Sequence, residues 1–199
     1  MKVLSIKFIR LYNRCMIILT GPSASGKTEI AKILFVKYGI KKVITHTTRP
    51  IRPTEIPEVD YHFVSEDNFN TMKAQNGFIE TTFYNGYQYG TSKTEVGDQK
   101  VLIVDANGLN AFVKLHNPRF VTFFIQANEI TRINRMIIRG QDLEFAKKRL
   151  AFDLVNFNRN TMPPIDYEID NESVTIEDAS DKIYHLYQKH LKKKTSSSH

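Results

Sequence analysis

The chain contains 199 residues, of which 41% are hydrophobic and 25% are charged, and this balance suits one globular domain with a core of its own. Its 13 Phe and 9 Tyr exclude a chain that is disordered throughout, and Cys15 as the single cysteine excludes a disulfide scaffold. No apolar run approaches the roughly 20 residues that a helix needs to cross a bilayer, so the sequence indicates no membrane partner.

The net charge of +7 is concentrated at the two ends of the chain. Residues 1–14 hold four Lys or Arg and no acid, residues 189–199 hold four Lys, and the body between them is left with a net charge of −1. Because basic tails on a near-neutral body do not form a broad basic face, we expect no nucleic-acid partner.

The N-terminal extension, residues 1–15, lacks the apolar stretch of a secretory signal because Lys7 and Arg10 divide it. Its basic, acid-free composition leaves a mitochondrial presequence open, and a protein start at Met16 is the simpler alternative. We expect a cytoplasmic enzyme with a dispensable extension, and a disordered Ser-rich tail over residues 192–199.

The first strand is predicted at Met16–Thr20, a short apolar run typical of a strand buried on both faces. A glycine-bearing turn follows, and then a helix that runs to about Tyr38 and stops at Gly39. Two further buried strands are predicted at 101–104 and 120–125. Each is followed by a helical pattern, so the body alternates strand and helix around a parallel sheet.

Residues 45–94 interrupt this alternation. They hold prolines at 50, 53 and 57, a short helix capped by Ser65, and alternating polar and aromatic residues around Phe83–Tyr89. With Asn85-Gly86 as a turn, this pattern predicts a small antiparallel insertion.

The C-terminal third is mainly helical. An arginine-rich helix is predicted over 129–139 and ends at Gly140, and a second helix begins near Asp142 and runs to about Asn160 before Pro163-Pro164. A last short strand is predicted at Tyr167–Ile169. Apolar residues at helical spacing from Ile176 to His190 predict the closing amphipathic helix.

The motif with the clearest chemistry is Gly21-Pro22-Ser23-Ala24-Ser25-Gly26-Lys27-Thr28, which satisfies G-x-x-x-x-G-K-[ST] between a predicted strand and a predicted helix. Glycines let the backbone wrap a phosphate, and amide N–H groups at the helix N-terminus point at the anion. Lys27 can reach the β- and γ-phosphates and the Thr28 hydroxyl can ligate Mg²⁺. The motif therefore predicts binding of a nucleoside triphosphate.

Four further motifs make the chain, from about Met16 to Leu191, resemble guanylate kinase. They are His46-Thr47-Thr48-Arg49-Pro50-Ile51-Arg52, Asp60-Tyr61-His62-Phe63-Val64-Ser65, Gly77-Phe78-Ile79-Glu80 and Tyr89-Gly90-Thr91-Ser92. The resemblance implies an α/β P-loop kinase fold: a parallel sheet flanked by helices, a small mixed β insertion that binds a nucleoside monophosphate, and a helical lid. The implied divisions are a domain over 16–191, with core segments 16–44, 95–128 and 155–191, the insertion 45–94 and the lid 129–154.

The insertion carries residue types suited to a guanine monophosphate. Arg49 and Arg52 can clamp a phosphate dianion through paired N–H donors, and Tyr61 and Tyr89 add hydroxyl donors, as the matching tyrosines of the family do. Guanine presents two adjacent donors and one acceptor along its Watson–Crick edge.

A carboxylate such as Glu80 accepts both of these donors, and hydroxyls such as Thr45 or Thr91 can donate to the guanine oxygen. Adenine would leave the carboxylate unpaired, a loss that can reach about 10⁴-fold. By resemblance, Asp105 also faces the guanine end.

The resemblance assigns the other site residues to ATP and to the transfer step. Arg132, Arg135 and Arg139 are spaced to share one helix face. Arg135, Arg139 and Arg149 fall on arginine positions of the family's lid, and Arg132 is the one for which a solvated basic face is plausible. Asn171 matches a residue that borders the adenine of ATP.

The chain departs from the family pattern around the phosphate loop. Ala24 stands where the family usually has glycine, and a positive φ there would strain it. Glu29 replaces a hydroxyl residue next to Thr28, and Ile103 replaces the first of two acids, which leaves Asp105 alone. These changes bear on Mg²⁺ affinity and turnover more than on substrate class.

The expected reaction is ATP + GMP to ADP + GDP, with Mg²⁺ as cofactor and dGMP as a further acceptor left open. The alternatives are a kinase of the same fold that acts on another small phosphate acceptor, and a weakly or non-catalytic binding module. The oligomeric state stays unknown.

Overall fold

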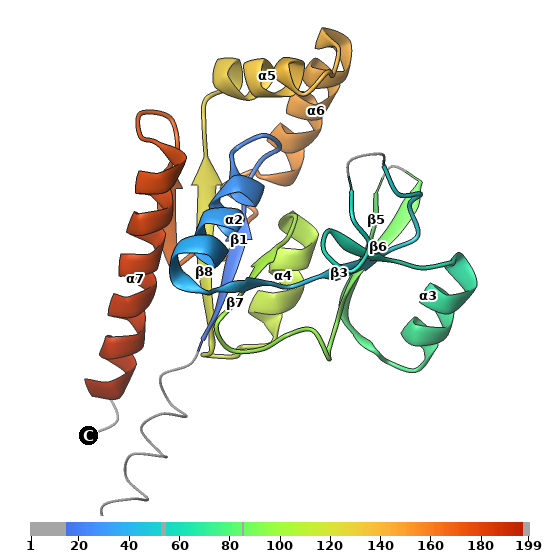
Figure 1. Cartoon of the computed structure of the whole chain (residues 1–199), viewed down its shortest axis with the longest axis horizontal. Coiled ribbons are helices and arrows are strands. Elements are labelled where there is room, and N and C mark those ends of the chain that lie inside the picture. Colours follow the sequence, from blue (N-terminus) through green and yellow to red (C-terminus); the bar gives the residue numbers. More distant parts are fainter. Residues whose placement is uncertain (1–14, 53–54, 85, 197–199) are drawn as a thin grey trace, which may run out of the picture.

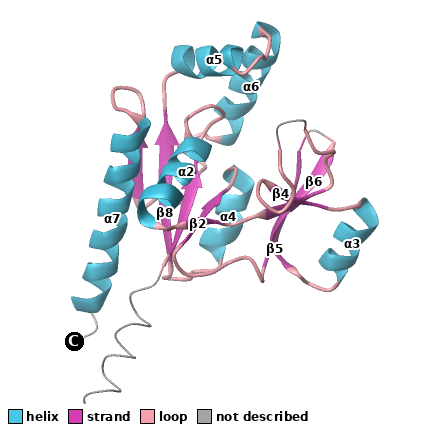
Figure 2. Ribbon diagram, in the orientation of Figure 1, coloured by secondary structure: helices cyan, strands magenta, loops and turns pink. Residues whose placement is uncertain are grey.

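The structure is a computed structural model that describes residues 15–52, 55–84 and 86–196. A five-stranded parallel sheet, in the order β2-β7-β1-β8-β9, forms its centre (Figures 1 and 2). The strands are β1 (Met16–Thr20), β2 (Lys41–Lys42), β7 (Lys100–Ile103), β8 (Phe120–Gln126) and β9 (Tyr167–Asp170). The predicted buried strands and the parallel sheet are confirmed.

Helices cover both faces of this sheet: α2 (Lys27–Tyr38) and α7 (Ile176–Ser196) pack on one face, and α4 (Ala106–Lys114) packs on the other. Of the remaining helices, α3 (Glu66–Ala74) belongs to the insertion, and α5 (Glu129–Ile138) and α6 (Leu143–Asn156) lie beyond one end of the sheet (Figure 1). Alternate residues of β1 face opposite sides: Ile17 and Leu19 join the cluster that α2 and α7 cover, and Met16 and Ile18 join the cluster under α4. β1 is therefore buried on both faces, and the loop that follows it begins from a rigid strand.

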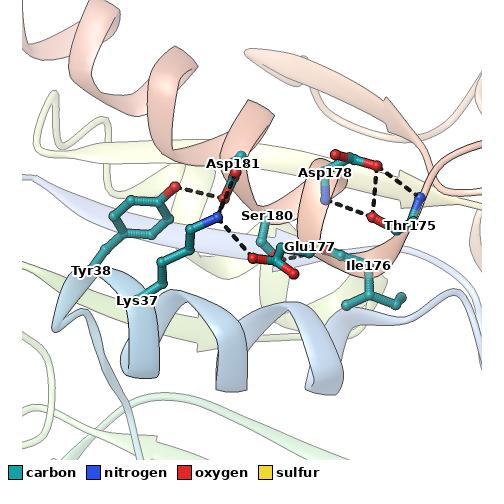
Figure 3. Close-up of polar contacts among 8 residues, drawn as sticks. All are labelled: Lys37, Tyr38, Thr175, Ile176, Glu177, Asp178, Ser180 and Asp181. Atoms are coloured by element: carbon teal, nitrogen blue, oxygen red, sulfur yellow. Dashed lines mark hydrogen bonds and ion pairs between the residues drawn. The ribbon is translucent and has the colours of Figure 1, made fainter.

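A polar bracket ties α2 to α7 (Figure 3). The Asp181 carboxylate accepts hydrogen bonds from Lys37 Nζ, at 2.7 and 2.8 Å, and from the Tyr38 hydroxyl, at 2.6 Å. At the start of α7, Thr175 Oγ1 donates to Asp178 Oδ2 and accepts from the Asp178 N–H, which caps the helix. The bracket orients α2, whose first residue is Lys27.

The insertion forms a second sheet in the order β4-β3-β6-β5, beside the core in Figure 1. Its strands are β3 (Thr45–Thr47), β4 (Tyr61–Phe63), β5 (Phe78–Tyr84) and β6 (Tyr87–Ser92). β5 and β6 pair antiparallel as predicted, whereas β3 and β4 pair in parallel. Ser65 caps α3 as predicted, and Asn85 of the predicted turn lies outside the described residues. Ile79 of β5 packs on the cluster under α4 and joins the insertion to the core.

α5 and α6 lie above the end of the central sheet that carries the phosphate loop (Figure 1). The predicted end of α6 at about Asn160 is wrong, because the helix ends at Asn156. Two asparagine side chains take over local hydrogen bonds there: Asn156 Nδ2 donates to the Phe152 carbonyl, and Asn158 Oδ1 accepts from the Asn160 N–H. The chain then turns before it reaches the prolines.

At the C-terminus the helix is longer than predicted. α7 continues to Ser196, so the tail predicted to be disordered from residue 192 is helical up to that residue. Residues 197–199 and the predicted extension before Cys15 lie outside the described residues. Within the part of the chain that is described, no helix combines the length and apolar composition needed to cross a membrane.

Candidate active site

The phosphate loop, residues 21–28, runs from the end of β1 into the first turn of α2. Two of its glycines have positive φ, at +135° for Gly21 and +105° for Gly26. A Cβ on Gly21 would collide with the Ile125 carbonyl, and one on Gly26 would collide with the Asn171 side chain. The loop therefore needs glycine at both positions, to turn and to lie close against β8 and the segment after β9.

Lys27 is folded over this loop. Its Nζ donates to the carbonyl oxygens of Gly21 and Pro22, both at 2.7 Å, and to Ser25 Oγ at 3.3 Å. Burial is the main cause that lowers the pKa of Lys27 to about 7, and the Asp153 charge opposes this shift. The nearby charges of Arg132, Arg149 and Arg139, in that order, lower the pKa further, so this lysine lies among the lid arginines.

Asn171 and Arg135 each donate hydrogen bonds to backbone carbonyls of the phosphate loop. Asn171 is fully buried, and its Nδ2 donates to the Ser25 carbonyl at 2.8 Å, while its Oδ1 has no hydrogen-bond partner among the described residues. Arg135 donates to the carbonyls of Ala24 and Asn171, at 3.2 and 3.1 Å. The contact of Asn171 with adenine stays a prediction; the observed contacts of Asn171 are with the loop.

Arg132 is the buried arginine of α5, so the solvated position that its spacing made plausible is wrong. It forms an ion pair with Asp153 of α6 and donates to the Ser23 carbonyl at 2.8 Å. Arg139 is exposed at the C-terminal cap of α5. Sequence reasoning missed Asp153; the available signal was an acid among the apolar residues of the last turns of a helix that also carries three basic residues.

The predicted phosphate clamp begins at Arg49, which is buried with 8% of its side chain exposed. Its Nη2 donates to Glu55 Oε1 at 2.7 Å, and its guanidinium lies 5.5 Å from the Tyr61 ring centre. Burial is the largest single effect on the pKa of Arg49 and lowers it, but the hydrogen bond to Glu55, the charge of Glu55 and a smaller contribution from Tyr89 together outweigh burial and raise this pKa.

Glu55, which sequence reasoning missed, also accepts the Arg52 N–H at 2.9 Å. The ring centres of Tyr61 and Tyr89 are 6.1 Å apart. The structure thus brings Arg49, Tyr61 and Tyr89 together, with Arg52 exposed at the rim.

The predicted guanine end lies on the same sheet. Glu80 of β5 and Thr91 of β6 are cross-strand partners, and Thr91 Oγ1 donates to Glu80 Oε1 at 2.6 Å. Burial raises the pKa of Glu80 and the charge of Asp105 adds to this, whereas the Thr91 hydrogen bond lowers it. Thr45, half-buried, pairs with Tyr61 across β3 and β4.

Asp105 follows β7 of the core and caps α4, accepting the Gly108 N–H at 2.8 Å. Since its charge acts on Glu80, the insertion and the core meet at this end.

Arg149 of α6 connects the two halves electrostatically. Burial is the main cause that lowers its pKa, and the positive charge of Arg52 lowers it further. Arg149 in turn lowers the pKa of Lys27. Arg149 therefore lies within electrostatic reach of both Lys27 of the phosphate loop and Arg52 of the insertion.

The donor set for a divalent cation is small. Thr28 is exposed at the start of α2, and Glu29 beside it forms an ion pair with Lys32. Ile103, at the end of β7, packs on the apolar cluster. Within the described residues there is no group of three His, Cys, Asp or Glu that could hold a metal ion. These residues fit a magnesium ion held mainly by substrate phosphates and water, with the Thr28 hydroxyl as a protein ligand.

Comparisons with known proteins agree on one family. The family model described as guanylate kinase matches residues 13–190. The chain is 38% identical to a guanylate kinase of Nitrosococcus oceani, a match that covers 69% of this chain and 71% of that protein. Against a guanylate kinase of Thiobacillus denitrificans the identity is 36%, with 67% and 68% covered.

A solved structure shares the fold. The guanylate kinase of Anaplasma phagocytophilum superposes with a TM-score of 0.66, at 22% identity, over 89% of this chain and 86% of that one.

Proposed function

The chain belongs to the guanylate kinase family, and we propose that it transfers the γ-phosphoryl group of ATP to GMP, giving ADP and GDP, through the residues described above. The observation that carries the assignment of residues is the position of Arg149, whose charge lowers the pKa of Lys27 and whose own pKa is lowered by the charge of Arg52. A donor pocket and an acceptor pocket that share one cation can bring a phosphate oxygen in line with a γ-phosphoryl group.

The triphosphate lies in the loop over residues 21–28, where backbone N–H groups and the N-terminus of α2 face the anion. Lys27, which donates to loop carbonyls in the described structure, turns its ammonium group to the phosphates. Asn171 borders the adenine, and Glu29 lies at the edge of this half of the site. Mg²⁺, when bound with the triphosphate, neutralises part of the charge that develops on the phosphate oxygens.

The acceptor phosphate is held by Arg49 and Arg52 with the hydroxyls of Tyr61 and Tyr89. Glu55 orients Arg49 through the ion pair at 2.7 Å. A phosphate monoester has a second pKa of about 6, so the acceptor is already largely dianionic at neutral pH. No general base is required, and the protein contributes positioning, charge neutralisation and exclusion of water.

Guanine is recognised by Glu80, which accepts from its two adjacent donors, with Thr45 as a donor to its oxygen and Asp105 at the same end. Thr91 already donates to Glu80, which favours the carboxylate orientation that guanine needs. Arg135, Arg139 and Arg149 surround the transferring group when the lid closes.

The deciding experiment is a phosphotransfer assay with ATP and a panel of acceptors: GMP, dGMP, AMP, UMP and ribose phosphates. We expect kcat/KM to be highest with GMP or dGMP. Faster turnover with any acceptor that lacks guanine would contradict the proposed specificity and favour the alternative of another small phosphate acceptor.

A non-catalytic binding module is the other alternative, and the intact Lys27 and Thr28 weigh against it. GMP binding without any ADP formation would establish that alternative. A cytoplasmic location and the absence of a nucleic-acid partner stay predictions, based on the divided apolar stretch of residues 1–14 and on the charge distribution. A variant that lacks residues 1–14 is expected to keep full activity.

A further inference from the structure

One residue of the phosphate loop, Ser23, is held on both sides of its backbone by the lid. The Ser23 N–H donates to Asp153 Oδ2 at 2.8 Å, and the Ser23 hydroxyl donates to Asp153 Oδ1 at 3.2 Å. The Ser23 carbonyl accepts from Arg132 Nε at 2.8 Å. Arg132 and Asp153, from α5 and α6, pair with each other through Arg132 Nη2 and are both buried.

The next residue, Ala24, has a φ of +59°, which is the left-handed region. A Cβ disfavours this conformation about 10-fold relative to glycine. The Ala24 carbonyl accepts from Arg135. The strained residue is therefore flanked by peptide groups that lid side chains hold in place.

We propose that Arg132 and Asp153 are positioning residues that keep Ala24 left-handed, and with it the loop amides aligned for the triphosphate. The proposal rests on the proposed function in that this loop binds the nucleotide phosphates. Because the brace comes from α5 and α6 (Figure 1), the shape of the loop depends on the position of the lid.

The ion pair of Arg132 and Asp153 also binds the backbone of Ser23, a contact that the stability of the fold alone does not require. A buried ion pair can often be replaced by apolar residues without loss of stability. Apolar residues cannot, however, accept an N–H and donate to a C=O of the same residue, as Asp153 and Arg132 do at Ser23. The planar guanidinium of Arg132 makes both of its contacts at once, a geometry that a lysine does not offer.

The test is a mutant cycle in the full chain, with Mg²⁺ and ADP as the probe and calorimetric titration as the measurement. The double variant Arg132→Leu/Asp153→Leu removes the brace without leaving either partner of the ion pair buried alone. Ala24→Gly is introduced into the wild type and into the double variant. Asp166→Asn is the matched control, because Asp166 likewise accepts an N–H and a hydroxyl, both from Thr122 and both at 2.8 Å, away from the loop.

We expect the double variant to bind ADP about 10-fold more weakly, and Ala24→Gly to restore most of this loss. In the wild type, Ala24→Gly should change ADP affinity by less than about 3-fold, because the brace already holds the loop. KM for ATP should rise in the double variant while kcat at saturating ATP changes little. Asp166→Asn should leave ADP affinity unchanged.

Additive effects, with Ala24→Gly acting equally in both backgrounds, would overturn the proposal, as would wild-type ADP affinity in the double variant. An equal loss in Asp166→Asn would also overturn it, because the effect would then be general destabilisation. If the double variant does not fold, Arg132→Lys replaces it, with an expected loss of about 3-fold that Ala24→Gly again restores. A wild type that binds ADP but does not phosphorylate GMP would contradict the proposed function and leave this coupling measurable.

Discussion

Thr91 and Glu80 face each other across two antiparallel strands, and the Thr91 hydroxyl donates a 2.6 Å hydrogen bond to the Glu80 carboxylate. This bond occupies the Thr91 proton and one oxygen of Glu80, and it holds the carboxylate in one orientation. The observed contact of the Thr91 hydroxyl is thus with Glu80, and its predicted donation to the guanine oxygen stays a prediction. The pair supplies the first two predictions.

Glu80→Gln should lower kcat/KM for GMP by at least about 100-fold, mainly through KM, because an amide presents an N–H where guanine needs an acceptor. Activity with IMP, which lacks the second donor, should fall less. Initial rates at varied GMP and IMP measure both effects. Glu66→Gln, at an exposed glutamate of the same insertion, is the control. An equal loss for GMP and IMP would argue against guanine recognition by Glu80.

Thr91→Val should shift the pH dependence of GMP binding. Burial raises the pKa of Glu80 and the Thr91 hydrogen bond lowers it, so removing the hydroxyl raises this pKa further. Only the ionised carboxylate accepts both guanine donors; KM for GMP should therefore begin to rise, as the pH falls, at a higher pH in Thr91→Val than in the wild type.

The raised pKa of Glu80 also makes the free energy of unfolding depend on pH. The native chain binds more protons than the unfolded chain between the unfolded and folded pKa of Glu80, so the contribution of Glu80 to the free energy of unfolding falls as pH rises through that window. KM profiles that coincide for wild type and Thr91→Val would contradict the role of the hydroxyl.

Lys27 should take up a proton when ADP binds. Its pKa is lowered from 10.5 to about 7, so at pH 8 most molecules hold a neutral amine, and phosphate oxygens restore the charged form. Calorimetric titrations in buffers of different ionisation enthalpy should show uptake of about one proton at pH 8 in the wild type. Lys27→Met should show none, and should lose at least about 100-fold in transfer while GMP binding is retained. Equal uptake in both proteins would assign the proton to another group.

The same lysine affects the stability of the nucleotide-free protein. Between pH 7 and 10.5 the unfolded chain holds a proton that the native chain has lost, so the free energy of unfolding rises with pH across this window. Chemical denaturation at several pH values should show a steeper rise in the wild type than in Lys27→Met.

Arg149→Met should lower kcat by about 100-fold and change the KM values for ATP and GMP less, because the cation acts on charge that develops during transfer. Lys147→Met is the matched control, since it removes an exposed cation from the same helix. Steady-state kinetics with both substrates separates the two. Similar losses in the two variants would indicate a general effect of lid charge.

Gly26→Ala should destabilise the protein more than Gly39→Ala does. Both glycines have positive φ, at +105° and +69°. A Cβ on Gly39 would meet open space, so the cost there is about 1–2 kcal/mol. A Cβ on Gly26 would in addition collide with the Asn171 side chain, which is fully buried. Thermal unfolding of the two variants compares the costs, and equal losses would contradict the close packing of Asn171 on the loop.

Local sequence signals predicted much of the fold and of the site. The buried strands around Ile17 and Phe123, the stop at Gly39 and the cap at Ser65 are each encoded within a few neighbouring residues. The end of α6 was placed too late because the sequence prediction relied on Pro163-Pro164 as the helix stop. The side-chain hydrogen bonds of Asn156 and Asn158 accompany an earlier end of the helix. The sequence shows that asparagines are present in this segment, but it does not show which backbone groups their side chains bind.

The sequence by itself determined the chemistry that the chain carries: a phosphate-binding loop with Lys27 and Thr28, and a set of arginines and tyrosines with Glu80. These are local patterns, and glycine positions or residue types reveal them without coordinates. Only the tertiary structure decided which charges are buried and with what partner.

The arginines of α5 illustrate the reason. A spacing of three and four residues places side chains on one helix face, but which face packs inward depends on the helices and loops around it. The pairing of Arg132 with Asp153, and of both with Ser23, joins residues that are up to 130 positions apart in the chain. Such pairings arise from the packing of the lid on the loop, which no local pattern encodes.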